Sequence, residues 1–227
     1  MKKYINLFIL SAFIFTSIIF LSGSDFDTIK ADSSSEPGTF NNPIIDSNMT
    51  LNEALEGLSV KCPDEIKEKQ CLVTVKYLSF DDKIHQGQFL IDRELKEDIL
   101  FAFEEALIEK FPIHSVIPVS HNNFRKNGQW DDDLSMEANN SSGFNYRLIT
   151  GGNTISMHAL GRAVDINPVQ NPYINRNLIL PKGSGYNPQT PGTLTEESAI
   201  VKALVLRGWT WGGNWTALKD YQHLEKN

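Results

Sequence analysis

Apolar side chains dominate two neighbouring runs of the chain, residues 71–80, which are rich in Val, Thr, Tyr and Leu, and residues 84–91. The polar residues Asp81-Asp82-Lys83 separate the two runs. Two apolar runs joined by a short polar turn are typical of an antiparallel β-hairpin. A third apolar run, residues 113–119, predicts a short buried strand.

The segment after the hairpin has helical periodicity. Its apolar residues at 95, 99, 102, 103, 106 and 107 fall on one stripe, with Glu and Lys opposite. This pattern predicts a helix that Asp92 caps and that ends before Pro112. Residues 195–207 predict a second helix, which Gly208 terminates. Earlier in the chain, Thr50-Leu51-Asn52-Glu53 has the sequence of a helix capping box.

Two polar stretches interrupt these elements. Residues 32–48 are rich in Ser, Pro, Gly and Asn and predict a linker, and residues 120–142 predict a long loop. Strands and helices do not alternate regularly, and the predicted hairpin is antiparallel. We therefore expect one α+β domain over residues 49–227.

The N-terminal segment has the pattern of a secretory signal peptide over residues 1–31. Lys2 and Lys3 precede a mostly apolar run, residues 5–21. We prefer cleavage at Ala31, although the small residues at 22–24 offer another place. An uncleaved anchor helix is the alternative, because the run is just long enough to span a bilayer. Either way, we expect the protein to be secreted or held at the cell wall, outside the cytoplasm.

The composition excludes several classes of protein. Hydrophobic residues make up 41% of the 227 residues and charged residues 22%, which is ordinary for a globular chain. The net charge of −7 argues against a nucleic-acid partner. Cys62 and Cys71 are too few for a disulfide scaffold, but outside the cell they could form one local bridge; two free thiols are the alternative. We expect a monomer with no stable membrane association after signal cleavage.

Candidate metal ligands occur in the second half of the chain. Residues 163–166 have strand character, so Val164 and Ile166 would face the core while Asp165 faces a cleft near His158. A chance pair or a buried hydrogen bond is the alternative for this histidine and aspartate. His223 would add a third ligand, and three protein ligands with one free position are typical of catalytic zinc.

The pattern Ser156-x-His158-x-x-Gly161-x-Ala163-x-Asp165, followed by Asp220-x-x-His223, resembles the zinc D-alanyl-D-alanine carboxypeptidase and L-alanyl-D-glutamate endopeptidase family. These enzymes act on peptidoglycan stem peptides. The run Trp211-Gly212-Gly213-Asn214-Trp215 resembles the endopeptidase branch, in which Asp is common at the position of Asn214. The resemblance implies an α+β fold like that of Hedgehog domains and these peptidases, a small antiparallel sheet with helices packed on it and a zinc site in a cleft.

The resemblance also implies roles for individual residues. One Zn²⁺ per chain would be held by His158, Asp165 and His223. Asp220 would be the general base, with Glu225 as the alternative base or as a partner of His223. Substrate binding would fall to Arg147, Ser156 and Trp211. A salt bridge is the alternative role for Arg147, a turn hydroxyl for Ser156 and core packing for the tryptophans.

The sequence thus predicts a secreted zinc metallopeptidase that hydrolyses peptidoglycan stem peptides. The specificity of an L-Ala-D-Glu endopeptidase is slightly favoured over that of a D-Ala-D-Ala carboxypeptidase. A non-catalytic module that keeps the zinc fold and binds cell-wall peptides or a protein partner is the alternative from another class.

Overall fold

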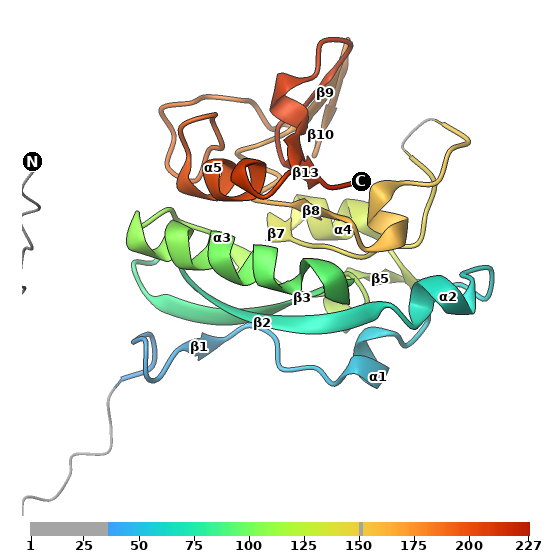
Figure 1. Ribbon diagram of the computed structural model, residues 1–227. Helices are drawn as coiled ribbons and strands as arrows, with labels where there is room; N and C mark the ends of the chain where they lie inside the picture. Colours follow the sequence, from blue (N-terminus) through green and yellow to red (C-terminus); the bar gives the residue numbers. More distant parts are fainter. Residues whose placement is uncertain (1–35, 150–151) are drawn as a thin grey trace, which may run out of the picture. The chain divides into compact units, whose positions relative to one another are not determined.

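A long antiparallel hairpin carries the first half of the fold (Figure 1). Strands β2 (Gln70–Leu78) and β3 (Ile84–Asp92) pair along their whole length, as their apolar runs predicted. The short strand β1 (Ile44–Ile45) pairs with β3 in parallel. Part of the segment expected to be a linker is therefore a strand, which two residues cannot signal by periodicity. The computed structural model describes residues 36–149 and 152–227, so the expected signal peptide lies outside it.

Two helices pack above the hairpin. A short 3₁₀ turn (Arg93–Leu95), capped by Asp92, leads into α3 (Lys96–Ile108). This helix lies between the hairpin and α5 (Ala199–Leu206), which Figure 1 shows as successive layers. The main core forms between them, with large fully buried side chains from each layer: Tyr77, Phe89, Leu95, Ile99, Ile200 and Leu204.

Short helices flank the hairpin on its N-terminal side. Thr50 caps α1 (Leu51–Ala54) with the predicted capping box, in which its hydroxyl accepts from the Glu53 N–H. Helix α2 (Asp64–Lys67) follows and leads into β2. The predicted disulfide between Cys62 and Cys71 is wrong, because both residues are free thiols. Cys71 packs against the main core and Cys62 against a second apolar cluster, and burial raises the pKa of both thiols.

The segment predicted to be a long loop, residues 120–142, contains regular elements. A 3₁₀ turn (Asn122–Phe124) and the hairpin of β5 (Arg125–Lys126) and β6 (Gln129–Trp130) precede α4 (Asp132–Glu137). The turn residues Asn127 and Gly128 both have positive φ, and Asn-Gly is a strong hairpin signal that the polar composition concealed. Strand β4 (Ser115–Val116) then pairs in parallel with β7 (Asn140–Ser141).

Two three-stranded antiparallel sheets make up the second half. In one, β13 (His223–Glu225) lies between β8 (Ala163–Asp165) and β11 (Thr210–Trp211). In the other, β9 (Tyr173–Asn175) lies between β10 (Leu178–Leu180) and β12 (Lys219–Asp220). The α+β class is confirmed as small sheets with a few helices, although two strand pairs are parallel. Within the described residues, no helix is long and apolar enough to cross a membrane.

Candidate metal centre

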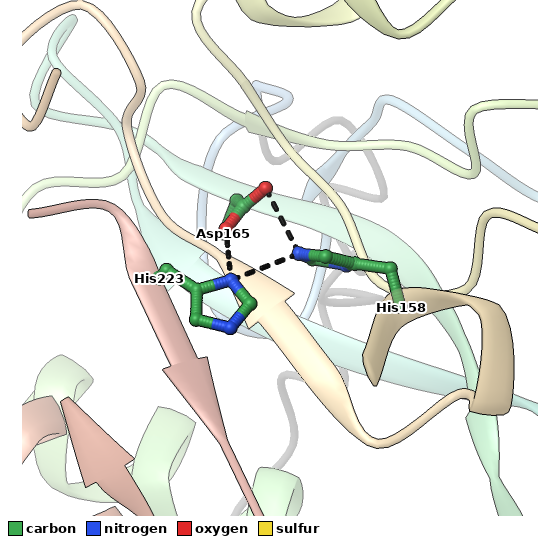
Figure 2. Close-up of side chains that lie close together, drawn as sticks. All are labelled: His158, Asp165 and His223. Carbon is green, nitrogen blue, oxygen red and sulfur yellow. Dashed lines mark hydrogen bonds and ion pairs between the residues drawn. The ribbon is translucent and has the colours of Figure 1, made fainter. Parts of the chain in front are cut away.

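Three buried side chains from separate parts of the second half converge at one point (Figure 2). The pairing of β8 with β13 places Asp165 opposite His223, and His158 comes from a 3₁₀ turn (Met157–Leu160). His158 Nε2 lies 3.1 Å from Asp165 Oδ2 and 3.1 Å from His223 Nδ1, while His223 Nδ1 lies 3.2 Å from Asp165 Oδ1. One nitrogen or oxygen of each residue is within 4.8 Å of the others, so the group could hold a metal ion.

The backbone around His158 is fixed from both ends of its turn. The Ser156 hydroxyl accepts from the His158 N–H at 3.2 Å and caps the turn, as in the turn-hydroxyl alternative for this residue. Gly161 ends the turn with φ +72°, where a Cβ would lie 2.7 Å from the backbone nitrogen of Asp92 and 2.1 Å from Gln70 Oε1 in the hairpin. No other residue type fits this close approach. The glycine of the motif therefore lets the His158 turn dock on β2.

Partners on the far side of each imidazole decide which nitrogen faces the centre. His158 Nδ1 lies 2.7 Å from the Gly143 carbonyl oxygen, to which it donates, so Nε2 presents its lone pair. His223 Nε2 lies 2.9 Å from Glu225 Oε2, so Nδ1 faces Asp165. Such outer partners orient metal-binding imidazoles in proteins. Glu225 thus contacts the ring of His223 on the side away from the other two residues.

The charges of the centre suit a divalent cation. Burial opposes ionisation of Asp165, but His158 and His223 outweigh it and hold the pKa of this carboxyl well below its usual range. Burial also opposes protonation of His223, yet hydrogen bonds to Asp165 and Glu225 raise its pKa to about 10. Without a metal, His223 is therefore a cation between two carboxylates. A metal at Nδ1 would take the place of that proton.

Asp220 lines the same cavity of about 250 Å³ as the three converging residues. Its Oδ1 atom is shielded from solvent and has no hydrogen-bond partner among the described residues. Burial raises the pKa of Asp220 to about 6, with His223 opposing the rise and Asp165 adding to it. A carboxylate oxygen left without a partner beside the candidate ligands is free to exchange a proton near neutral pH.

The backbone of Asp220 is held by the tryptophan- and glycine-rich run. Trp211 Nε1 donates to the Tyr221 carbonyl at 2.7 Å, and Lys219 Nζ donates to the Gly213 carbonyl at 2.8 Å. Gly212 opens a 3₁₀ turn (Gly212–Asn214) so close to Asp220 that a Cβ would lie 2.5 Å from its carbonyl oxygen. The run therefore fixes the residues on both sides of Asp220, whose Oδ1 has no hydrogen-bond partner in the described part of the chain.

The structure corrects the expectation for Trp211. This side chain is buried in the core and does not line the cavity, so the packing alternative holds for it. Trp215 lines the cavity instead, with its ring centroid 5.4 Å from that of His223. The sequence placed both tryptophans in one run, but only tertiary packing decides which of them faces the cleft.

Arg147 lines the cavity and forms an ion pair, which is the alternative role that the sequence left open for it, with a partner that the sequence did not name. Its NH2 atom lies 2.9 Å from Asp132 Oδ2, and Asp132 Oδ1 accepts from Asn145 Nδ2 at 3.0 Å. Asp132 itself lines the cavity. The only available signal was the acidic run from Asp131 to Asp133, which we placed in a loop and did not connect with Arg147.

Comparison with known proteins finds one family whose model covers the residues of the candidate metal centre. A model of the family described as D-alanyl-D-alanine carboxypeptidase matches residues 150–226. The match includes His158, Asp165, Asp220 and His223 but neither Arg147 nor Asp132. Among curated proteins and solved structures, none matches the chain significantly. The C-terminal third of this chain is therefore similar to the D-alanyl-D-alanine carboxypeptidase family of peptidases, which its two-part motif also resembles.

Proposed function

We propose that this protein is a zinc-dependent peptidase that hydrolyses peptide bonds in peptidoglycan stem peptides. The observation that carries the proposal is the meeting of His158, Asp165 and His223 in one cavity with Asp220, whose Oδ1 has no partner among the described residues. The family match over the same residues supports it. Most buried polar atoms in folded proteins have a hydrogen-bond partner, so a carboxylate oxygen without one beside three candidate ligands favours a chemical role.

The donor set fits one Zn²⁺. Two imidazole nitrogens and one carboxylate oxygen are a common catalytic zinc set, which leaves a position for water or substrate. Gly143 and Glu225 hold the two rings so that Nε2 of His158 and Nδ1 of His223 face Asp165. The chemistry that zinc supplies in such a site is polarisation of the scissile carbonyl and a lower pKa of water.

The other cavity residues have distinct roles in the proposed reaction. Asp220 takes the proton of the attacking water at Oδ1 and passes it to the leaving amine. The metal-free pKa of Asp220, about 6, would fall with a divalent cation bound nearby, which would favour its basic form. Arg147 stabilises the oxygen of the scissile carbonyl or binds a polar group of the substrate.

The shape of the cleft favours an endopeptidase of the L-Ala-D-Glu type over a D-Ala-D-Ala carboxypeptidase. A second hollow of about 160 Å³, lined in part by Trp130 and Tyr146, continues beyond Arg147. An endopeptidase needs room for substrate on both sides of the scissile bond, whereas a carboxypeptidase needs a closed end with an unpaired cation. Arg147 is already paired with Asp132.

The proposal extends to where and how the protein works. The signal-peptide pattern of residues 1–31 supports export and action at the cell wall. The net charge of −7 supports a protein without a nucleic-acid partner. We propose that it acts as a monomer with no stable membrane association after cleavage of the signal.

Digestion of purified peptidoglycan by the zinc-loaded protein tests the proposal. Mass spectrometry distinguishes the loss of one D-alanine from scission after L-alanine. We expect scission after L-alanine, no products after zinc is removed with a chelator, and recovery when zinc is restored. Intact peptidoglycan after treatment with zinc-loaded protein would contradict the proposal and favour a binding module without activity.

A further inference from the structure

Asp132 lies where two hollows of the protein meet. The cavity of the metal centre and the neighbouring hollow of about 160 Å³ have two lining residues in common, Asp132 and Arg147. The remaining residues of that hollow are uncharged: Gly57, Leu58, Ser59, Gln129, Trp130, Asn145 and Tyr146. A substrate that crosses from one hollow to the other therefore passes this ion pair.

Asp132 is anchored independently of Arg147. The N-cap residue Asp131 accepts from the Leu134 N–H at 3.1 Å and starts α4, whose first residue is Asp132. Asn145 donates to Asp132 Oδ1 at 3.0 Å, which leaves Oδ2 for Arg147 at 2.9 Å. Both oxygens are thus engaged, and a carboxylate of the same chain compensates the charge of Arg147.

The guanidinium of Arg147 is held by acceptors of its own chain. Its NH2 atom lies 2.9 Å from Asp132 Oδ2 and its NH1 atom donates to the Leu148 carbonyl at 3.2 Å, while its Nε is buried. A carboxylate at the end of a substrate would have to compete with Asp132 for the charge of the guanidinium.

We propose that Asp132 is a specificity-determining residue that selects against substrates ending in a carboxylate next to the scissile bond. By occupying the guanidinium of Arg147, it leaves internal peptide bonds as the favoured substrates. The inference rests on the proposed peptidase function, because it concerns the substrate of the same cleft. It adds a residue outside the matched segment of the family.

Steady-state kinetics of the zinc-loaded full chain test the proposal with two synthetic stem peptides. The peptides are identical except that the residue after the scissile bond ends in a free carboxylate or in an amide. Wild type should favour the amide. Asp132→Asn frees Arg147, so the ratio of kcat/KM for the carboxylate peptide to that for the amide peptide should rise about tenfold or more, mainly through KM. The control Asp133→Asn removes the same charge from an exposed residue of α4 and should leave the ratio unchanged.

Several results would overturn the inference. A folded, zinc-loaded Asp132→Asn with the wild-type ratio would do so, as would an equal loss for both peptides, which is the mark of a merely structural role. If Asp132→Asn does not fold, Asn145→Ala removes only the anchor of Asp132 and should shift the ratio the same way by a smaller factor; no shift would reject the idea. A wild type that binds zinc but cleaves neither these peptides nor peptidoglycan would instead overturn the proposed function and this inference with it.

Discussion

Two groups of acidic and basic side chains lie near the last strand, and they use their charges differently. Asp98, in α3, accepts from Trp209 Nε1 at 2.9 Å, from Lys226 Nζ at 2.8 Å and from Arg207 NH1 at 3.2 Å. Three residues before Lys226, His223 joins the candidate metal centre. Within the last few residues of the chain, Lys226 therefore belongs to an ion cluster with Asp98, and His223 is a candidate metal ligand.

The difference lies in which oxygen atoms have partners. Burial disfavours the ionised form of Asp98, but its three donors outweigh burial and hold the pKa of this carboxyl below its ordinary value. Asp220 has an oxygen without a hydrogen-bond partner in residues 36–149 and 152–227, and burial raises its pKa to about 6. A carboxylate surrounded by fixed donors stabilises the fold, whereas one with a free oxygen beside other titratable groups is suited to chemistry.

Removal of His158 should have the largest effect. His158→Ala deletes one of three candidate ligands, so zinc content should fall from about one per chain to near zero, and peptidase activity should fall to background. Elemental analysis of the purified protein measures the metal. His121→Ala is the control, since His121 caps a 3₁₀ turn away from the cavity. Full zinc content in His158→Ala would show that the metal binds elsewhere.

Asp220→Asn should separate catalysis from metal binding. The amide keeps the size of the carboxyl but cannot accept a proton at neutral pH, so kcat should fall by roughly 10²–10⁴-fold. Zinc content should stay near normal, because Asp220 is not one of the three converging residues. Wild-type turnover in this variant would place the base elsewhere, and Glu225→Gln would be the next variant to measure.

The sequence predicted the elements whose signal is local. The β2–β3 hairpin, helix α3 and the cap at Thr50 each follow from periodicity or a short motif. The convergence of His158, Asp165 and His223 was predicted from the resemblance of the two-part motif to the peptidase family. The buried positions of Val164 and Ile166 also followed from strand alternation.

Features that depend on contacts between distant segments were missed. The pair of Asp132 with Arg147 forms only when α4 packs against the segment before Leu148. Likewise, β1 is a strand only because β3 lies beside it. Cys62 and Cys71 are near in sequence but pack in different apolar clusters, so spacing alone suggested a bridge that does not form.

Zinc affinity should rise with pH. Such a dependence would further distinguish the candidate metal centre from the ion cluster around Asp98. The raised pKa of His223, about 10, means that the metal-free imidazole carries a proton at neutral pH, and zinc must displace it. Each unit of pH below that value should therefore cost about tenfold in apparent affinity for this one proton. Competition with a chromogenic chelator between pH 6 and 8 measures the slope, which should lie near zero if no proton is released.

Asp98→Asn should have the smallest effect on catalysis and act on stability instead. The lowered pKa of Asp98 means that its stabilising contribution is present above the unfolded-state pKa and is lost as pH falls through the folded-state value. At pH 7 the variant loses its charge-assisted hydrogen bonds to Lys226 and Arg207, so unfolding free energy should fall by about 1–3 kcal/mol.

Urea titration of the Asp98→Asn variant at pH 7, beside Glu97→Gln as an exposed control on the same helix, measures that loss. Zinc content and kcat at a temperature where the variant is folded should equal those of wild type, because neither cation of the cluster lines the cavity. If Asp98→Asn lost zinc in the folded state, the C-terminal segment would couple the two groups. The ion cluster would then help to hold His223 in place, and it could no longer be treated as a separate source of stability.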